Sequence, residues 1–368
     1  MPEPKTQSPR RLAGRVALVA GATRGTGRGM AVALGEAGAT VYCTGRSVRG
    51  QPATAGRPET IEETSELVTA HGGVGIPVRT DHTVPREVEA LVERIRADHG
   101  GLDVLINDVW GGDELTEWGR PLWEHSLDNG LLMQRRAVHS HIITTRYAIP
   151  LMFDREGALI VEVTDGVSAG YRGNVYYDLA KVSVIRLATA LAYELRLRHV
   201  TAVAISPGFL RSEAMLERFG ITEANWRDQI ANDPHWAESE TPLFVGRCVA
   251  ALAADETHWR VSGAALTSWD LAERYDVNDA DGRRPHWGRH IAKAADAAWV
   301  EIVRRAKRAL ATRAPGIELI ADRASLVLAA GPATRPVLEP ELFMTDPESI
   351  IGELLDRYDR ASRQEVRA

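Results

Sequence analysis

The sequence predicts an α/β fold in which a doubly wound parallel sheet is covered by helices on both faces. Two observations support this prediction. Strand-like and helix-like segments alternate from residue 16 onward, and the first strand-like segment is followed directly by a glycine-rich turn and a helix. Such alternation is typical of consecutive β-α-β units, whose crossover helices leave the strands parallel and buried on both faces.

The expected elements are short strands separated by longer helices. We expect strands at residues 16–20, 40–44, 74–79, 104–107, 158–164, 201–206 and 264–267, and helices at 25–37, 59–70, 87–98, 127–153 and 176–198. Residues 210–242 interrupt the alternation, so they form an insertion between the last two strands.

The chain divides into three predicted regions. Residues 1–10 contain three prolines and predict a flexible N-terminal arm, and residues 11–275 hold the alternating segments. Residues 276–368 predict a mainly helical C-terminal extension, because apolar residues recur at helical spacing between 291 and 310. In addition, Asp346-Pro347-Glu348 is typical of a helix start, with an N-cap acceptor followed by proline. We expect this extension to pack on the main domain or on a partner subunit.

The composition argues against several classes of protein. The chain has 368 residues, 44 % of them hydrophobic and 26 % charged, and a formal net charge of −6. No large basic block is present, which argues against nucleic acid as a partner. The longest early apolar run, residues 16–20, is far too short to cross a membrane. The only cysteines, Cys43 and Cys248, predict neither a disulfide framework nor a metal site, and they fit a cytoplasmic protein.

The turn after the first strand has the glycine spacing of a phosphate-binding loop. It contains Gly21-Ala22-Thr23-Arg24-Gly25-Thr26-Gly27 and opens the first helix. Glycines let the backbone approach a pyrophosphate, which then lies at the helix N-terminus. Because the loop joins a strand to a helix, we predict a dinucleotide site in a Rossmann-type domain rather than a simple tight turn.

The end of the second strand indicates which dinucleotide is bound. It continues as Thr44-Gly45-Arg46-Ser47, with no carboxylate to bind the ribose 2′-hydroxyl of NAD. Arg46 and Arg24 can instead bind a 2′-phosphate, to which a guanidinium group is well suited. The sequence therefore predicts NADP(H) as cofactor. The alternative is that both arginines are solvated surface residues.

Tyr177 and Lys181 form the candidate catalytic pair. They lie four residues apart in a predicted helix, which puts both side chains on one face. A lysine ammonium beside a phenol favours the phenolate, so the tyrosine can exchange a proton with a carbonyl oxygen near neutral pH. Tyr176 is the rival for this role, but only Tyr177 has a lysine at this spacing.

The glycine spacing, the Tyr-x-x-x-Lys pair and Ser206-Pro207-Gly208 after the sixth strand together resemble the short-chain dehydrogenase/reductase family. The resemblance covers roughly residues 14–275. It is closest to the branch that contains the dehydrogenase/reductase member 1 proteins, to which Leu271-Ala272-Glu273-Arg274-Tyr275 and Asp281-Gly282-Arg283 are similar. It implies an oxidoreductase that interconverts a carbonyl and an alcohol, with Tyr177 as the acid/base. Lys181 would activate the tyrosine and bind the nicotinamide ribose.

The resemblance implies further contacts and partners. Additional cofactor contacts would come from Asp81, from Asn107 at the start of the family's Asn-Asn-Ala-Gly stretch, and from Pro207, Gly208 and Leu210. Residues 210–242 would form a substrate lid. Its apolar residues could line a substrate pocket or simply pack the lid onto the domain: Met215, Leu216, Phe219, Trp226 and Trp236. The long helices at 127–153 and 176–198 would pair across a two-fold axis in a homodimer or homotetramer.

Two positions depart from the family's pattern. Asp165 follows the fifth strand where the family carries its catalytic serine, with Thr164 and Ser168 as nearby hydroxyls. Counting along the long helix, Gly130 falls where the family has an asparagine, with Asn129 one residue early. An ionised Asp165 would repel the tyrosine phenolate, whereas a protonated one could donate a hydrogen bond to the substrate oxygen. A third alternative is that Asp165 only caps a loop.

Two functions fit these residues. The first is an NADP(H)-dependent oxidoreductase acting on a small, partly apolar carbonyl or alcohol. The second is an NADP(H)-binding regulatory protein without turnover. The Tyr177–Lys181 pair favours the first, while Asp165 and Gly130 favour the second. His139 and His141 lie two residues apart on a predicted helix, so we expect surface or interface residues rather than metal ligands.

Overall fold

A computed structural model of the chain describes residues 11–54, 56–153, 155–167, 170–313, 318–322, 325–330, 333–338 and 356. The predicted arm at 1–10, Ser168 and the predicted helix start at 346–348 lie outside these residues. The chain divides into two compact units between Trp287 and Gly288, and the second unit also includes Gly170–Gly173. The predicted boundary, at residue 275, falls before this division.

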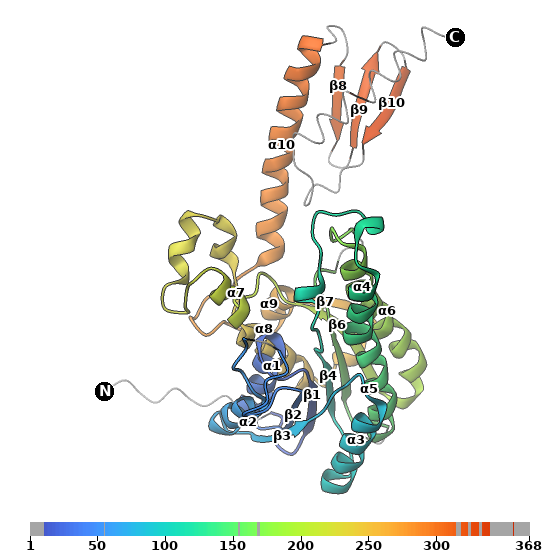
Figure 1. Cartoon of the computed structure of the whole chain (residues 1–368), viewed down its shortest axis with the longest axis vertical. Coiled ribbons are helices and arrows are strands. Elements are labelled where there is room, and N and C mark those ends of the chain that lie inside the picture. Colours follow the sequence, from blue (N-terminus) through green and yellow to red (C-terminus); the bar gives the residue numbers. More distant parts are fainter. Residues whose placement is uncertain are drawn as a thin grey trace. The chain divides into compact units, whose positions relative to one another are not determined.

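The first unit contains a seven-stranded sheet whose paired strands all run parallel (Figure 1). The strands are β1 (Val16–Ala20), β2 (Thr40–Gly45), β3 (Val74–Arg79), β4 (Val104–Asn107), β5 (Ala158–Val163), β6 (Val200–Ser206) and β7 (Ala265–Thr267). Their order is β3-β2-β1-β4-β5-β6-β7, with β1 beside β4 at the point where the order reverses. The predicted doubly wound fold is confirmed, with strand limits within one residue of those expected.

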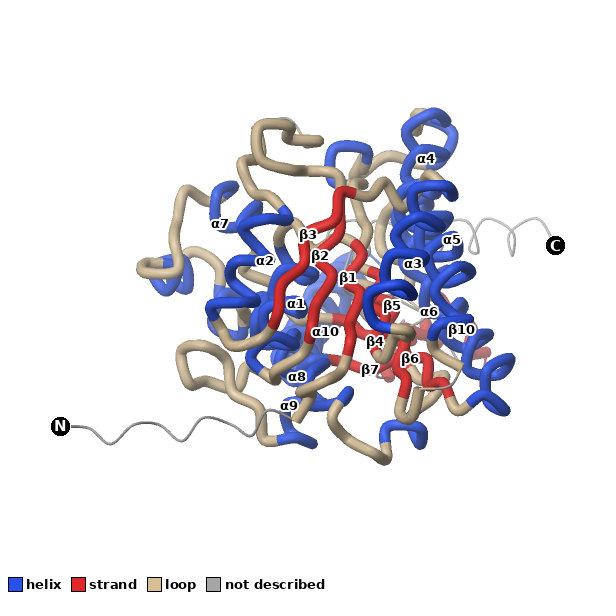
Figure 2. Tube along the Cα trace, turned by 90° about the horizontal axis from the view of Figure 1, so that it is seen from below, coloured by secondary structure: helices blue, strands red, loops and turns tan. Residues whose placement is uncertain are grey.

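Helices cover both faces of this sheet. They are α1 (Gly25–Glu36), α2 (Ile61–Ala70), α3 (Pro85–His99), α4 (Leu127–Gln134), α5 (Ser140–Ala148), α6 (Val175–Leu195), α8 (Pro242–Ala253) and α9 (Ser268–Tyr275), while α7 (Glu213–Arg218) lies in the segment between β6 and α8. Figure 2 shows α1, α2 and α8 on one side of the strands and α3, α4, α5 and α6 on the other. The sequence did not predict α8, although Thr241 caps its first turn and Pro242 occupies the first helical position.

The apolar core has one layer on each face of the sheet. Successive residues of a strand point to opposite faces. Accordingly, Ala17 and Val19 of β1 join a buried cluster with α1 and α8, whereas Val16 and Leu18 join a second cluster with α3 and α5. Because both faces of β1, β4 and β5 are buried, these strands are apolar along most of their length instead of alternating.

The helix predicted at 127–153 is interrupted. After α4 the chain makes a π-helical turn at Arg135–His139, continues as α5, and ends in a short 3₁₀ turn at Ile149–Leu151. A π turn inserts an extra residue and rotates the faces of the following helix, and such turns are frequent at functional sites. This break changes which residues of the helix face the candidate site.

The second unit begins with the long helix that the sequence predicted. Helix α10 (Trp287–Arg313) confirms the helical character of the extension. It is followed by β8 (Glu318–Asp322), β9 (Ser325–Ala330) and β10 (Ala333–Leu338), an antiparallel sheet of order β10-β9-β8. These strands were not expected, because helical spacing upstream had suggested a mainly helical extension.

Two global properties bear on location. Among the residues described, no helix is both long and apolar enough to cross a membrane. Cys43 and Cys248 are both free thiols buried in the core of the first unit. The cytoplasmic location stays a prediction.

The contact between α1 and α8 supplies a test of the packing. Gly29 and Gly246 face each other there, and a Cβ built on either would overlap backbone atoms of the opposite helix. Replacing a glycine inside a helix by alanine normally stabilises the protein. Here we expect Gly246→Ala to lower the free energy of unfolding by about 1–3 kcal/mol, because the added methyl group overpacks the contact. Urea unfolding measures this difference. Equal or higher stability of the variant would show that the helices are not this close.

Candidate active site

The candidate site lies at one edge of the parallel sheet. In an open α/β sheet the turns that follow the strands emerge at the same edge, where ligands bind near the point at which the strand order reverses. The turns after β1, β2, β4, β5 and β6 carry most of the predicted site residues, while Asp81 follows β3 and Tyr177 and Lys181 lie in α6. The fold therefore brings together residues that lie more than 180 positions apart in the sequence, from Gly21 to Leu210.

The loop between β1 and α1 requires its glycines. Gly21 and Gly25 have φ values of +94° and +57°, in the left-handed region that glycine tolerates best. A Cβ on Gly21 would also lie 2.6 Å from the Asp108 carbonyl oxygen, and one on Gly27 would overlap the Gly21 carbonyl. In contrast, a Cβ on Gly25 would meet nothing nearer than Ser212 at 3.9 Å. The start of α1, with Thr26 in its first turn, is thus not crowded at the Cα of Gly25.

Arg24 belongs to this loop, and its guanidinium group contacts two neighbouring side chains. Its Nη2 donates to Thr54 Oγ1 at 3.0 Å, and its Nη1 lies 3.7 Å from Glu59 Oε2. Nη1 is buried and has no hydrogen-bond partner among the described residues. Burial lowers the pKa of Arg24, and the negative charge of Glu59 opposes that shift. An orphaned guanidinium N–H fits a 2′-phosphate acceptor.

Arg46 and Asp81 lie at the ends of β2 and β3. The Asp81 carboxylate accepts hydrogen bonds from the Thr83 N–H at 2.9 Å and the Thr83 hydroxyl at 2.7 Å, so it caps the turn into α3. Burial favours the neutral form of Asp81. The two hydrogen bonds from Thr83 and the positive charge of Arg46 outweigh this effect, so the pKa of Asp81 is lowered. Burial is the main cause that lowers the pKa of Arg136, and the positive charge of Arg46 lowers it further. Arg46 therefore lies near Asp81 and Arg136, and its predicted contact with the cofactor stays a prediction.

Tyr177, Lys181 and Asp165 come together as predicted. Asn174 caps α6 by accepting from the Tyr177 N–H at 3.0 Å. The Tyr177 hydroxyl donates to Asp165 Oδ2 at 2.5 Å, which excludes a purely loop-capping role for the aspartate. Lys181 Nζ lies 5.4 Å from the centroid of the Tyr177 ring and 3.9 Å from that of Trp110. The ammonium group is thus near the phenol that it is expected to activate.

Two tryptophans fix the orientation of the Tyr177 ring. Trp110 meets it edge to face with centroids 5.3 Å apart, and Trp118 lies tilted against it at 5.1 Å. Such pairs add stability beyond the apolar area that they bury. The neighbouring hydroxyl of Thr164 is engaged elsewhere, because it donates to the Lys181 carbonyl oxygen at 2.9 Å. Thr164 therefore supports α6 instead of replacing the missing serine.

The rival tyrosine lies outside the site. Gly130 packs so closely on Tyr176 that a Cβ there would overlap the ring. The assignment of Gly130 to the family's asparagine position stays a prediction, since Gly130 precedes the π turn at 135–139. Ala137, inside that turn, lines a cavity together with Lys181. The π turn therefore places a small apolar side chain, that of Ala137, near Lys181.

Asn107 is fully buried at the end of β4, where its side chain links this strand to α5 and β5. Its Nδ2 donates to Thr145 Oγ1 and to Glu162 Oε1, both at 2.8 Å. Glu162 Oε2 in turn lies 2.6 Å from His141 Nδ1, although the sequence had suggested that His141 lies at a surface or interface. His141 is 2 % exposed. The predicted contact of Asn107 with the cofactor stays a prediction.

Sequence reasoning missed a buried acid next to this cluster. Asp108, His141 and Lys181 line a cavity of about 20 Å³, enough for one water molecule. Burial raises the pKa of Asp108 to about 7, although Lys181, His141 and the Gly27 N–H favour the ionised form. Its only signal in the sequence is a carboxylate at the second position of the Asn-Asn-Ala-Gly stretch. Asp108 is thus a buried polar group near Lys181 that adds to the predicted site residues.

The segment after β6, which is predicted to form a lid, has an apolar core of its own. Ser206 Oγ donates to the Pro207 carbonyl at 2.8 Å, Gly208 passes close to Trp287 and Glu240, and Leu210 bridges to Glu240. Within the lid, apolar residues pack on one another: Phe209, Met215, Leu216, Ile221, Trp226, Ile230 and Trp236. Trp226 and Trp236 are buried, so they hold the lid together instead of lining an open pocket.

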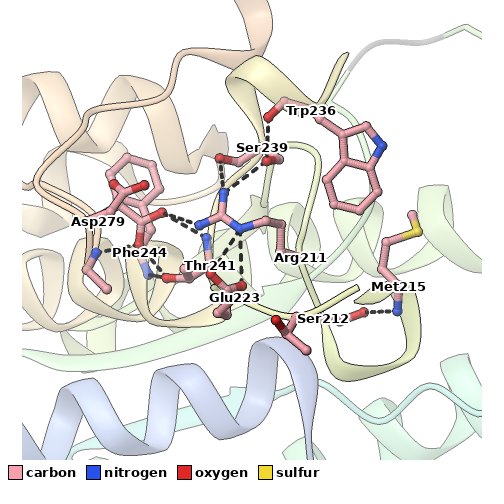
Figure 3. A network of polar contacts seen from close by, with 12 residues as sticks. Arg211, Ser212, Met215, Glu223, Trp236, Ser239, Thr241, Phe244 and Asp279 are labelled. Carbon is pink, nitrogen blue, oxygen red and sulfur yellow. Dashed lines mark hydrogen bonds and ion pairs between the residues drawn. The ribbon is translucent and has the colours of Figure 1, made fainter. Parts of the chain in front are cut away.

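Arg211 fastens the two ends of the lid (Figure 3). It is fully buried, and its Nη1 donates to the carbonyl and hydroxyl oxygens of Ser239 at 2.6 and 2.9 Å. Its Nε donates to Glu223 at 3.1 Å, its Nη2 lies 3.6 Å from Asp279 Oδ2, and the guanidinium stacks 4.1 Å from the Trp226 ring centre. A buried charge with these partners holds the start of α7 in one place.

Comparisons with known proteins agree with this geometry. A family model described as short chain dehydrogenase matches residues 15–220. The chain is 34 % identical to dehydrogenase/reductase SDR family member 1 of Mus musculus over 275 residues, which covers 73 % of this chain and 84 % of the relative. It is 30 % identical to the 3-oxoacyl-(acyl-carrier-protein) reductase FabG of Staphylococcus aureus, covering 66 % and 92 % of the two chains.

Solved structures share the fold. A short chain dehydrogenase from Mycobacterium thermoresistibile matches with a TM-score of 0.63 at 21 % identity, over 75 % of this chain and 92 % of that one. This likeness shows the fold alone, whereas the family model and the relatives share sequence as well. The chain belongs to the short-chain dehydrogenase/reductase family, whose members are oxidoreductases that use nicotinamide cofactors.

Proposed function

We propose that this protein is an NADP(H)-dependent oxidoreductase that interconverts a carbonyl and an alcohol. The observation that carries the proposal is the Tyr177–Asp165 hydrogen bond beside Lys181, at the edge of the sheet where the glycine loop and Arg24 also lie. An NADP(H)-binding regulatory protein without turnover would have no use for a tyrosine placed between a carboxyl and an ammonium group.

The proposed mechanism assigns one task to each of the three side chains. The bound cofactor supplies a hydride to the carbonyl carbon or accepts one from the alcohol. In the reducing direction, Tyr177 donates the proton of its hydroxyl to the carbonyl oxygen. Lys181 stabilises the phenolate that remains by its positive charge. Asp165, which is exposed, orients the Tyr177 hydroxyl before substrate binds and returns a proton to it from solvent.

The cofactor would lie along the turns at the edge of the sheet. Its pyrophosphate would occupy the N-terminus of α1, and its 2′-phosphate would take the buried N–H of Arg24 with support from Arg46. Glu59 beside Arg24 does not replace the acid that binds a free 2′-hydroxyl, because it already pairs with Arg24 and Arg57. The substrate would be small and partly apolar, since Trp110 and Trp118 flank the reacting tyrosine.

The coenzyme preference is directly measurable. We expect NADPH to bind at least about tenfold more tightly than NADH, a difference of about 1.4 kcal/mol. Arg46→Asp should reduce or reverse the preference by repelling the 2′-phosphate. Fluorescence titration of both coenzymes gives the dissociation constants, and Arg260→Asp, a charge reversal at an exposed remote arginine, is the matched control. Equal affinities for the two coenzymes in the unmutated protein would contradict the assignment.

The catalytic roles predict an order of activity among variants. On a panel of aldehydes, ketones and 3-oxoacyl thioesters, Tyr177→Phe should lower kcat at least about 100-fold while NADPH binding stays nearly unchanged. Asp165→Ala should also lose much of the turnover, by roughly the 100-fold expected for one lost hydrogen-bonding group in an active site. Asp165→Ser should recover part of it by restoring a hydroxyl. Turnover by Tyr177→Phe at the unmutated rate would refute the mechanism.

We further propose that two or four copies of this chain associate through α4 and α6. Large apolar side chains remain exposed on these helices: Leu127, Leu131, Leu179, Val182 and Tyr193. Monomeric proteins seldom expose such a set on neighbouring helices, and self-complementary dimers are the commonest assemblies. Light scattering at micromolar concentration should therefore give a dimer or tetramer, and Leu179→Lys should shift it toward monomer. A monomeric unmutated protein would be inconsistent with this assembly.

A further inference from the structure

The N-terminus of α1 is capped by a residue of the lid. Arg24, at the N-cap position, makes no side-chain cap, and the first turn of α1 contains no acidic residue. Instead, the Gly25 N–H donates to Glu213 Oε2 at 2.8 Å. Glu213 is the first residue of α7, 188 positions further along the chain. The free N–H groups at the start of a helix attract anions, and here a carboxylate from the lid satisfies one of them.

Several contacts hold Glu213 at this position. Arg28 of α1 lies 3.8 Å from Glu213 Oε1, so the carboxylate is bound by both a backbone N–H and a guanidinium group. The preceding Ser212 caps α7 by accepting from the Met215 N–H. Arg211, one residue earlier, is fixed by the buried network of Figure 3. The lid therefore presents Glu213 to α1 from a rigid base.

The same N–H is required by the proposed cofactor. A pyrophosphate at the start of α1 needs these backbone donors, and it carries the same sign of charge as the carboxylate. We propose that Glu213 competes with the pyrophosphate of the cofactor for the Gly25 N–H. Cofactor binding then displaces Glu213 from Gly25 and removes one contact between α7 and α1. This inference rests on the proposed function, because it assumes that a dinucleotide binds there.

Competition of this kind lowers the apparent affinity by the fraction of molecules in which Glu213 is displaced. It also couples the cofactor to the lid. Removal of the carboxylate should strengthen the binding of any ligand that brings a pyrophosphate, but not of a ligand that occupies only the 2′-phosphate site. Adenosine 2′-monophosphate is such a ligand, and inorganic pyrophosphate tests the anion site by itself.

The experiment compares the unmutated protein with Glu213→Ala, Glu213→Gln and Asp228→Asn by isothermal titration. Asp228 is an exposed acid elsewhere in the lid, so Asp228→Asn removes the same charge without touching α1. We expect Glu213→Ala to bind both NADPH and inorganic pyrophosphate about tenfold more tightly, with Glu213→Gln in between because its amide is a weaker acceptor. Adenosine 2′-monophosphate should bind all four proteins equally.

Two results would overturn the inference while the proposed function stands. One is NADPH binding to Glu213→Ala with unchanged or weaker affinity, which would make Glu213 neutral or a cofactor ligand. The other is an equal gain in Asp228→Asn, which would reduce the effect to overall charge. If none of the four proteins bound NADPH or NADH, the proposed function itself would fail. Thermal unfolding of each variant checks that all four are folded.

Discussion

The parallel direction of all seven strands is the constraint on which the candidate site depends. It forces the turns after β1, β2, β4, β5 and β6 to emerge at one edge, where residues from distant parts of the chain become neighbours. The two-layered core makes this arrangement rigid, because β1, β2, β4, β5 and β6 are packed on both faces. Every contact argued for the site, from Gly21 to the lid, follows from that edge.

Acidic and basic side chains also meet at this edge, some of them buried and one of them exposed. Asp108 is buried behind Lys181, Glu162 is paired with His141, and Asp165 holds the hydroxyl of Tyr177. Burial raises the pKa of Asp108 to about 7, and it raises that of Glu240 under the lid to about 8. Neutral carboxyl groups cost less to bury than ionised ones, which is how the structure tolerates Asp108 behind Lys181 and Glu240 under the lid.

Much of the fold followed from local sequence patterns, because apolar runs and glycine turns act within a few residues. The strands at 16–20, 74–79 and 104–107 and the pairing of Tyr177 with Lys181 are of this kind. The Asp165 position was also predictable, since it depends on distance from a strand end.

Features that depend on long-range packing could not be predicted in this way. The π turn at 135–139 could not be read from the helical pattern, and Ala137 within it lines the same cavity as Lys181. His141 is buried and pairs with Glu162 of β5, which lies 21 positions further along the chain. The cap of α1 by Glu213 joins residues 188 positions apart, and no pattern within either segment signals it.

The central claim is that this edge of the sheet performs hydride transfer with NADP(H). The most direct test is incubation of the protein with NADPH deuterated at C4 of the nicotinamide and a panel of carbonyl compounds, followed by mass spectrometry of the alcohols. The account predicts one deuterium on the carbinol carbon of at least one product, and none when Tyr177→Phe replaces the unmutated protein over the same time. Tight NADPH binding without deuterium in any product would contradict it and would favour a regulatory protein.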